Sequence, residues 1–437
     1  MKYYLIGIKG AGMSALGLIL NDLGYEVIGY DDDADYQFTE EKLHERNIPI
    51  YVDDSFELDD RTIVVRSTAI KDSHPEIIKA KALDLKMYEY NEMLGKLVNM
   101  FDGVTIAGCH GKTTTTSLMA HVMNNIVGCN YLIGDGTGYA SKENKKFILE
   151  ACEYKRHFLV YEPEYAVITN IDLDHVDYFQ DMDDVISAYQ EYGNNASKMV
   201  IACGDDPYTH SLDLNTPCFY YGLESDNDII AKNVEYTKDG IKFEVFVEEN
   251  YYGFFDLPLY GKHMLLNALA VIGVCYYERL EAKEVAKHLK TFKGAGRRFE
   301  EEIIDDTVVI DDYAHHPNEV KAIIKGVKQK YPDKKVITVF QPHTFSRTGE
   351  FYEEIAASLN LSDYSYVLDI YPAREKQEDY PDITSQKIID NLENGELIDN
   401  STSSKLYQYK GNVILFMSPK EIKYIKDDLI NHLKNSN

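Results

Sequence analysis

The sequence predicts an α/β protein made of successive parallel-sheet domains. Short apolar strand segments alternate with helix-compatible segments along all 437 residues, and this pattern restarts near residue 100 and again after residue 294. Such alternation is typical of parallel sheets with crossover helices. The length has room for two to four domains of about 100–200 residues each. The hydrophobic content of 44% is sufficient for substantial cores.

The first domain is predicted to begin with a β-α-β unit. An apolar strand at 3–6 leads into a glycine turn at 7–12, a helical pattern that runs to Leu23 and a second strand at 26–29. Asp31 follows, about 20 residues after the turn. The spacing Gly-x-x-Gly-x-Gly differs from the Gly-x-Gly-x-x-Gly of nicotinamide-binding folds. The turn therefore supports a diphosphate at a helix N-terminus rather than a redox cofactor.

A phosphate-binding loop is the most informative feature of the chain. An apolar strand at 104–107 runs into Gly108-Cys-His-Gly111-Lys112-Thr113. Backbone N–H groups of this turn can face an anion, Lys112 can neutralise a β/γ oxygen, and the Thr113 hydroxyl can ligate Mg²⁺. The general motif carries its first glycine where this chain has Ile106, so only a narrower form of the motif fits.

Acidic and imidazole side chains follow later strands of the same domain, which are predicted at 147–149, 166–169 and 199–202. Glu150 and Glu153 lie at the end of one strand, and His175 follows another. Mg²⁺ prefers hard oxygen ligands, and a neutral imidazole could hold a second ion. The alternative is that the two glutamates form a solvated acidic edge and that His175 caps a helix. Cys109 is expected at a helix N-terminus beside Lys112, where a reactive thiolate is favoured.

A third α/β region is predicted after the basic, hinge-like segment 294–299. Its strands at 307–310, 336–340 and 413–417 each end in polar residues, where ligands of parallel sheets bind. Histidine, aspartate and arginine at the ends of two strands could form a pocket for a small zwitterion. The alternatives are that His315 and His316 form a packed turn and that Arg347 pairs with a helix carboxylate.

The composition argues against several classes of protein. With 73 acidic and 45 basic residues the formal charge is −28, which disfavours binding to nucleic acid and to anionic membranes. Six cysteines without a Cys-x-x-Cys pair favour neither a disulfide framework nor a zinc site. No export signal is recognised, and the apolar segment 264–277 is shorter than a bilayer span of about 20 residues. We expect a cytoplasmic protein with a buried helix at 264–277.

Six motifs occur in an order that resembles the Mur ligase family, from Gly7 to nearly the C-terminus. They are Gly-x-x-Gly-x-Gly-Met-Ser at 7–14, Gly-x-His-Gly-Lys-Thr-Thr-Thr-Thr at 108–116, Thr-Asn-Ile-x-x-Asp-His at 169–175, Gly-Arg-Arg-Phe-Glu at 296–300, Asp-Asp-Tyr-Ala-His-His-Pro at 311–317 and Phe-Gln-Pro-His at 340–343.

The resemblance implies a fold of three domains and an activity. The domains would be a Rossmann-like UDP-binding domain at 1–98, a central P-loop ATP-binding domain at 99–296 and a Rossmann-like amino-acid-binding domain at 297–437. The reaction would be the ATP- and Mg²⁺-dependent ligation of L-alanine to the lactoyl carboxylate of UDP-N-acetylmuramate through an acyl phosphate. It would serve peptidoglycan synthesis, and hence cell-wall biogenesis, cell shape and cell division.

Three alternatives remain beside this activity. A ligase that adds a preformed tripeptide to the same sugar nucleotide would share every central motif. A catalytically silent binding protein on the same fold is disfavoured because the expected catalytic residues are all present. A nicotinamide oxidoreductase is a distant third. The sequence predicts no oligomeric state.

The resemblance also implies roles for individual residues. The catalytic residues would be Lys112, Glu150, His175, Arg298 and Asp312. Thr113, Glu150 and His175 would hold Mg²⁺. ATP would bind Gly108, Cys109, His110, Gly111, Lys112, Thr113, Thr114, Asn170, Asn267, Arg298 and Asp312. The substrates would bind Gly10, Gly12, Met13, Ser14, Asp31, Tyr313, His315, His343 and Arg347.

The chain departs from the family pattern at four places. Cys109 stands where a threonine is frequent, and Met264 replaces the first of two asparagines, which leaves Asn267 alone. Thr344 stands where many members carry an arginine, so recognition of the amino-acid carboxylate would depend mainly on Arg347. The segment 418–421, Ser-Pro-Lys-Glu, replaces Gly-Ala-Gly-Asp. Its residues predict a helix start, with a serine N-cap, proline at the first helical position and a capping-box glutamate.

Overall fold

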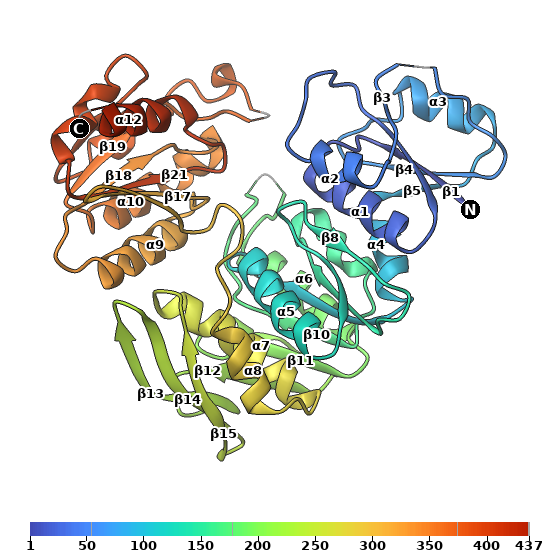
Figure 1. Cartoon of the computed structure of the whole chain (residues 1–437), viewed down its shortest axis with the longest axis horizontal. Helices are drawn as coiled ribbons and strands as arrows, with labels where there is room; N and C mark the ends of the chain where they lie inside the picture. Colours follow the sequence, from blue (N-terminus) through green and yellow to red (C-terminus); the bar gives the residue numbers. More distant parts are fainter. Residues whose placement is uncertain (54, 177, 374, 436–437) are drawn as a thin grey trace. The chain divides into compact units, whose positions relative to one another are not determined.

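The computed structural model describes residues 1–53, 55–176, 178–373 and 375–435. It contains three β-sheets, each flanked by helices (Figure 1). The residue contacts divide the chain into two compact units. The first unit comprises Met1–Lys232, Val245–Gly253 and Leu266–Leu289, and the second comprises Asn233–Glu244, Phe254–Leu265 and Lys290–Asn437. The predicted α/β class is confirmed.

The first sheet is parallel throughout, with strand order β3-β2-β1-β4-β5. Its strands are β1 (Lys2–Ile6), β2 (Glu26–Tyr30), β3 (Ile50–Tyr51), β4 (Thr62–Arg66) and β5 (Met87–Glu89). The helices are α1 (Ala11–Asp22), α2 (Glu40–Glu45), α3 (Pro75–Ala82) and α4 (Tyr90–Val98). The predicted β-α-β unit is confirmed as β1, α1 and β2.

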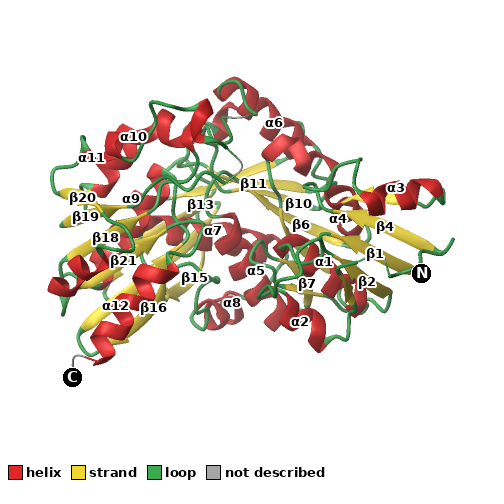
Figure 2. Cartoon of the chain, turned by 90° about the horizontal axis from the view of Figure 1, so that it is seen from above, coloured by secondary structure: helices red, strands yellow, loops and turns green. Residues whose placement is uncertain are grey.

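Both faces of this sheet are buried because β1 is apolar at every position after the first. Tyr3 and Leu5 belong to the core that includes α1, whereas Tyr4 and Ile6 belong to the core that includes α3. Helices α1 and α3 accordingly lie on opposite sides of the sheet (Figure 2). A strand that is apolar on both faces is typical of parallel sheets covered by helices.

The second sheet has ten strands in the order β15-β14-β13-β12-β11-β10-β6-β9-β7-β8. The strands are β6 (Asp102–Ala107), β7 (Cys129–Leu132), β8 (Gly138–Tyr139), β9 (Lys146–Glu150), β10 (Tyr165–Ile168), β11 (Met199–Cys203), β12 (Cys218–Gly222), β13 (Ile229–Thr237), β14 (Gly240–Val247) and β15 (Asn250–Leu257). The helices are α5 (Lys112–Ile126), α6 (Met182–Asn194), α7 (Lys262–Tyr277) and α8 (Ala282–Leu289), with 3-10 helices η1 (Tyr154–Val160) and η2 (Thr209–Ser211).

The first two sheets are joined within the first unit. β8 packs on α1 so closely that a Cβ at Gly138 would lie 2.5 Å from the carbonyl oxygen of Ala15. The Asp22 carboxylate at the end of α1 accepts the N–H of Ala140 at 3.2 Å and the guanidinium of Arg46 at 2.8 Å. The glycine turn and the phosphate loop therefore belong to one compact body.

The third sheet, in the second unit, has the order β16-β17-β21-β18-β19-β20 and is parallel except at β16. Its strands are β16 (Glu300–Ile304), β17 (Thr307–Asp312), β18 (Val336–Phe340), β19 (Tyr364–Val367), β20 (Gly395–Leu397) and β21 (Val413–Met417). Its helices are α9 (Pro317–Lys330), α10 (Phe345–Leu359), α11 (Gln386–Ile389) and α12 (Lys423–Asn435), with 3-10 helices η3 (Gln377–Asp379) and η4 (Ser403–Tyr409).

Alternate side chains of each strand in this sheet face different helices. Ile310 and Leu415 belong to the core formed with α9 and α10, whereas Val309 and Ile414 belong to the core formed with α12. The two helical layers lie on opposite sides of the sheet (Figure 2). All nine strands predicted from the sequence occur at their expected positions.

The predicted helix start after β21 is wrong. Helix α12 begins at Lys423, and the segment between Ser418 and the helix is not helical. The Arg297 guanidinium donates to the carbonyl oxygens of Ser418, at 2.9 Å, and Pro419, at 2.7 Å. These carbonyls are thereby held by a side chain instead of a helical backbone. Glu421 pairs with Lys426 rather than closing a capping box.

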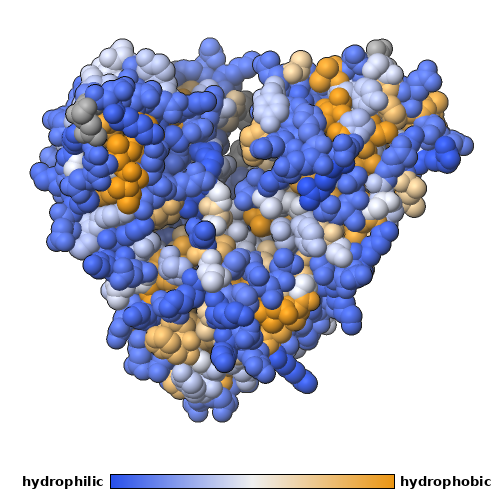
Figure 3. Space-filling view, in the orientation of Figure 1, coloured by the Kyte–Doolittle hydropathy of each residue, from blue (hydrophilic) through white to orange (hydrophobic). Residues whose placement is uncertain are grey.

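The apolar segment at 264–277 forms most of α7, as predicted, and its buried residues include Leu265, Ala268 and Leu269. No helix among the described residues is long and apolar enough to span a bilayer. On the face drawn in Figure 3, hydrophilic residues cover most of the surface and apolar residues form separate patches. This surface agrees with the acidic composition.

Candidate active site

The phosphate loop, residues 108–113, connects β6 to α5 and requires glycine at two positions. Gly111 is the N-cap of α5 with a φ of +81°, and Gly108 has a φ of +141°. A Cβ at Gly108 would lie 1.9 Å from the Thr169 hydroxyl. Asn170 clamps the loop, because its side chain accepts the N–H of His110 and donates to the carbonyl of the same residue, both at 2.8 Å. The strand-to-helix geometry of an anion-binding loop is therefore present.

A buried ion pair lies beside this loop. The Lys112 ammonium donates to the carboxylate oxygens of Glu153 at 2.9 and 3.1 Å and to the carbonyl of Gly108. Glu153 is only 1% exposed, and its carboxylate also lies 3.5 Å from Nε2 of His175. Burial raises the pKa of Glu153, but the Lys112 charge and the hydrogen bond with His175 together outweigh burial and lower that pKa. Both members of the pair are therefore ionised.

Strand register explains why Glu153 rather than Glu150 reaches the loop. β6 and β9 are parallel with Ile106 opposite Glu150, so a residue three positions further along lies level with the phosphate loop. Glu150 instead accepts the N–H of Gly134 at 3.1 Å. The sequence offers both glutamates as metal residues, and the family resemblance implies Glu150 for the metal set. The position of Glu153 beside both Lys112 and His175 favours Glu153 for that role.

The structure contradicts two of the alternative interpretations here. Glu153 is buried, so it is not part of a solvated acidic edge. His175 is not a helix cap, since it has a φ of +52° in a turn and the next helix, α6, is capped by Asp181. The His175 ring packs on Tyr154 at a centroid distance of 4.7 Å, and the backbone N–H of His175 donates to the Asp174 carboxylate at 2.7 Å. These contacts fix the imidazole in front of Glu153.

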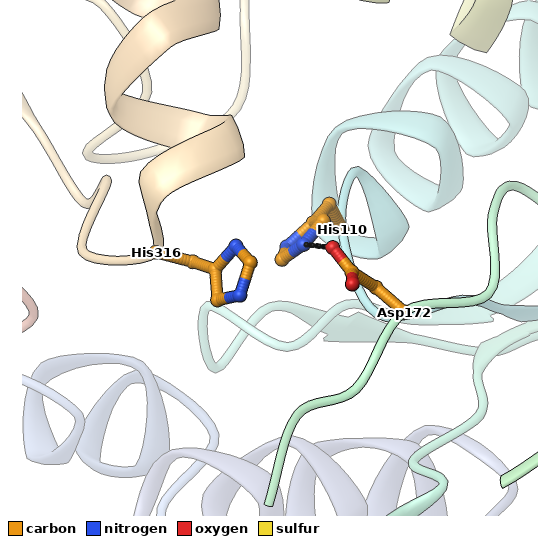
Figure 4. Close-up of side chains that lie close together, drawn as sticks. All are labelled: His110, Asp172 and His316. Carbon is orange, nitrogen blue, oxygen red and sulfur yellow. Dashed lines mark hydrogen bonds and ion pairs between the residues drawn. The ribbon is translucent and has the colours of Figure 1, made fainter. Parts of the chain in front are cut away.

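The expected reactive thiolate at Cys109 is wrong. The residue is buried, and its Sγ donates to the carbonyl of Asp172 at 3.0 Å and accepts the N–H of the same residue at 3.2 Å. Burial, reinforced by the Glu153 carboxylate, raises the pKa of the Cys109 thiol well above its usual value. The thiol ties the loop to the segment after β10. Nε2 of the neighbouring His110 also lies within hydrogen-bond distance of the Asp172 carboxylate, at 3.2 Å (Figure 4).

Other predicted nucleotide residues gather at the same loop. Asn267 on α7 is 5% exposed, and a Cβ at Gly111 would lie 2.7 Å from its side-chain oxygen. Thr113 is partly exposed in the first turn of α5, whereas Thr114 is buried. In the first unit the structure therefore brings together Gly108, His110, Gly111, Lys112, Asn170, His175 and Asn267.

The glycine turn of the first sheet is shaped by the chain itself. Asp31 at the end of β2 accepts the N–H of Lys9 at 2.9 Å. Met13 and Ser14 are buried, and the Ser14 hydroxyl donates to the carbonyl of Ala11. These side chains face the interior, so a ligand at Gly10 would meet the backbone N–H groups at the start of α1.

Glycine is required at position 12 by a steric contact that the sequence alone does not reveal. A Cβ at Gly12 would lie 2.5 Å from the hydroxyl of Tyr90. Tyr90 is the first residue of α4, and burial together with the charge of Glu150 raises the pKa of its hydroxyl. A protonated tyrosine thus separates the glycine turn from the end of β9. No motif in the sequence signals this contact, which joins residues far apart in the chain.

In the second unit, Asp312 at the end of β17 is a buried carboxyl group. Its oxygens accept the N–H groups of Phe299 at 2.9 Å and Ala314 at 2.8 Å. Burial raises the pKa of Asp312 to about 6, despite the opposing charge of Arg298. The Arg298 guanidinium lies 4.7 Å from the centre of the Tyr313 ring. Asp312, Arg298 and Tyr313, all predicted site residues, are therefore adjacent.

A second group in the same unit surrounds His343. Its Nδ1 lies 3.0 Å from the Arg347 guanidinium, and its ring lies 5.6 Å from the ring of His315. His315 is also 3.3 Å from the carboxylate of Glu319. His316 has a structural role instead, because its Nδ1 accepts an N–H in the first turn of α9 and caps that helix. The packed-turn interpretation is thus confirmed for His316.

Comparisons with known proteins agree with this architecture. Sequence models of the family match residues 2–102 ("Mur ligase family, catalytic domain"), 106–275 ("Mur ligase middle domain") and 297–418 ("Mur ligase, glutamate ligase domain"). Similar solved structures include a UDP-N-acetylmuramate-alanine ligase of Thermotoga maritima, with a TM-score of 0.81 at 24% identity over 100% of both chains.

Two further solved structures share the fold. A murein peptide ligase of Psychrobacter arcticus has a TM-score of 0.69 at 21% identity, covering 100% of this chain and 99% of that one. A MurF ligase of Thermotoga maritima in complex with ADP has a TM-score of 0.65 at 17% identity, covering 96% and 98%. Since the three family models together span most of the sequence, the chain belongs to the Mur ligase family, whose members are ATP-dependent ligases of peptidoglycan precursors.

Proposed function

We propose that the protein ligates L-alanine to the lactoyl carboxylate of UDP-N-acetylmuramate, with ATP converted to ADP and phosphate. The observation that carries the proposal is the phosphate loop with its buried Lys112–Glu153 pair and the adjacent His175. The full-length likeness to an alanine ligase supports this choice of substrates. The reaction would serve peptidoglycan precursor synthesis in the cytoplasm.

The chemistry explains why such a site is needed. A carboxylate is a poor acylating agent, so a lactoyl oxygen first attacks the γ-phosphorus of ATP, and ADP leaves. The amine of the amino acid then attacks the acyl phosphate, loses a proton and expels inorganic phosphate. The anions that meet in the first step repel one another. Lys112 and the N–H groups of the phosphate loop would offset this repulsion as charge moves onto the leaving ADP.

Magnesium suits the donor set beside the loop. A buried carboxylate (Glu153), a hydroxyl at the start of α5 (Thr113) and an imidazole (His175) are the oxygen and nitrogen donors available there. Mg²⁺ would neutralise phosphate oxygens and polarise the transferred phosphoryl group. Glu150 and the other residues of the implied metal set remain proposals, with Glu153 the better placed carboxylate.

The second unit would supply the acceptor and part of the nucleotide contacts. We assign Arg298 and Asp312 to ATP, and Tyr313, His315, His343 and Arg347 to the amino acid. Arg347 is suited to a carboxylate because its planar guanidinium can donate two parallel hydrogen bonds. In the first unit, the N-terminus of α1 after Gly10 would receive the diphosphate of the sugar nucleotide.

Steady-state kinetics with defined acceptors test this proposal. ADP formation should require UDP-N-acetylmuramate, ATP, Mg²⁺ and an amino acid together. L-alanine should be preferred over glycine and L-serine by a modest factor, because one methyl group discriminates by only about 1–3 kcal/mol. If the tripeptide L-alanyl-γ-D-glutamyl-meso-diaminopimelate has a higher kcat/KM than L-alanine, the protein is instead a recycling ligase and the alanine assignment is wrong.

A further inference from the structure

The Lys420 side chain lies next to the His343 group in the second unit. The Lys420 ammonium is 4.8 Å from the centre of the Tyr371 ring, and that ring stacks on His343 at 5.9 Å. His343 in turn contacts Arg347 at 3.0 Å. Among the residues that the structure describes, no carboxylate forms an ion pair with Lys420, although the chain carries 73 acidic residues. We call His343, Arg347 and Tyr371 the acceptor cluster.

The acceptor cluster is held by backbone contacts. His343 and Tyr371 form an isolated parallel bridge, in which Thr344 donates its N–H to the carbonyl of Tyr371 at 2.9 Å. The N–H of Tyr371 is accepted by the carbonyl of Pro342 at 2.8 Å. The backbone of Tyr371 is therefore held, and its ring lies close to both the His343 ring and the Lys420 ammonium.

The segment that carries Lys420 is also held in place. The Ser418 hydroxyl accepts the N–H of Lys420 at 3.2 Å, and Arg297 binds the carbonyls of Ser418 and Pro419. Lys420 itself is exposed, so its ammonium is available to a ligand. A helix that began at Pro419 would have included Lys420, whereas the observed turn presents its side chain toward Tyr371.

We propose that Lys420 is a second cation for the carboxylate of the incoming amino acid, beside Arg347. This inference rests on the proposed function. Thr344 follows His343 in the sequence, where many family members carry an arginine, and Lys420 would supply a positive charge that Thr344 lacks. In such a site the Arg347 guanidinium would orient the carboxylate with directional hydrogen bonds, and the Lys420 ammonium would attract it as a point charge. Lys420 would therefore act on acceptor affinity rather than on phosphoryl transfer.

The nucleotide is the competing ligand for Lys420. The carbonyl of Asp312 accepts the N–H of Ser418 at 3.1 Å, so the same segment also borders the residues assigned to ATP. The contact with Tyr371 favours the acceptor, because that ring is packed against His343. Kinetics can separate the two ligands, since each has its own KM.

The test compares three variants of the full-length protein. Lys420→Gln should raise the KM for L-alanine about fivefold, which is the size expected for an exposed charge pair, and leave kcat and the KM values for ATP and UDP-N-acetylmuramate unchanged. Lys420→Arg should restore the KM to within about twofold, because the charge is kept. Lys423→Gln, at an exposed lysine three positions further along in α12, is the matched control and should have no effect.

Distinct outcomes separate the failure of this proposal from that of the proposed function. If the unaltered protein forms ADP with L-alanine but Lys420→Gln leaves its KM unchanged, Lys420 does not bind the acceptor. A rise in the KM for ATP alone would assign Lys420 to the nucleotide and also overturn the proposal. If the unaltered protein forms no ADP with any amino acid or peptide, the proposed function itself is wrong.

Discussion

Glu153 in the first unit and Asp312 in the second are both buried carboxyl groups at the ends of parallel strands, yet their pKa values move in opposite directions. Burial raises the pKa of Glu153, but the Lys112 ammonium at 2.9 Å and the hydrogen bond with His175 together lower it. Asp312 is raised to about 6 because burial outweighs Arg298, which is not in ion-pair contact with it. Burial raises the pKa of both groups, so direct hydrogen-bonded contact with a cation decides in which direction the pKa of a buried carboxyl group moves overall.

Replacing Lys112 should have the largest effect. Lys112→Ala should lower kcat by about three orders of magnitude, because it removes the charge that stabilises the transferred phosphoryl group. It should also destabilise the protein by about 3–5 kcal/mol, because Glu153 is left buried without its main partner. Turnover and urea unfolding measure the two effects.

A double variant separates the effect of Lys112 on turnover from its effect on stability. Lys112→Met with Glu153→Gln removes both charges, so it should recover much of the lost stability but none of the activity. Lys112→Ala retaining more than about a tenth of normal turnover would remove Lys112 from phosphoryl transfer. If Lys112→Ala left the free energy of unfolding unchanged, contact with Lys112 would not be what keeps Glu153 ionised.

Asp312 and Glu153 should make the free energy of unfolding depend on pH in opposite directions. Asp312 binds its proton more tightly in the folded state, so its contribution to stability is present below pH 3.8 and is lost as pH rises to about 6. Relative to Asp312→Asn, the unaltered protein should lose about 3 kcal/mol over that range. Glu153 should contribute stability above pH 4.5 and lose it as pH falls. Urea unfolding from pH 3 to 7 measures both, and slopes of the same sign would break the comparison.

His175 tests the proposed metal site beside Glu153. His175→Ala should raise the Mg²⁺ concentration needed for half-maximal activity by about 10- to 100-fold, while the KM for UDP-N-acetylmuramate changes little. The control is His210→Ala, because that ring lies elsewhere in the first unit and stacks on Tyr220. An unchanged Mg²⁺ titration would give His175 a purely structural role.

Cys109 should show the smallest effect. Its raised pKa and buried Sγ predict slow alkylation by iodoacetamide in the folded protein and rapid alkylation after denaturation. Peptide mass spectrometry after a short pulse measures the labelled fraction. If Cys109 were labelled at similar rates in the folded and the denatured protein, it would be a reactive thiolate, contrary to the structure.

The sequence predicted the strand ends well because apolar segments and glycine turns are local signals. The phosphate loop at 108–113 and the strand before Asp312 required no knowledge of distant residues. The partner of Lys112 was harder to predict, since it depends on the register of β6 against β9 and lies 41 residues away. Motif matching implies Glu150 as the metal ligand, because a motif carries no information on the register of β6 against β9.

Two other features depended on contacts that no local pattern encodes. A side chain at position 12 would collide with the Tyr90 hydroxyl, whether or not a phosphate is bound. No local pattern reveals this, because Gly12 and Tyr90 meet only in the folded chain. The segment after β21 has good helix-capping residues, yet hydrogen bonds from Arg297 hold it as a turn. Tertiary contacts override local helix signals at such positions.

Isotope transfer tests the central claim, ligation through an acyl phosphate, most directly. UDP-N-acetylmuramate labelled with ¹⁸O in the lactoyl carboxylate is incubated with ATP, Mg²⁺ and L-alanine, and the released phosphate is analysed by mass spectrometry. Because a carboxylate oxygen attacks the γ-phosphorus and leaves with it, each phosphate should carry one ¹⁸O atom from the substrate. Phosphate without ¹⁸O would contradict the acyl phosphate and show that ATP is hydrolysed by water instead.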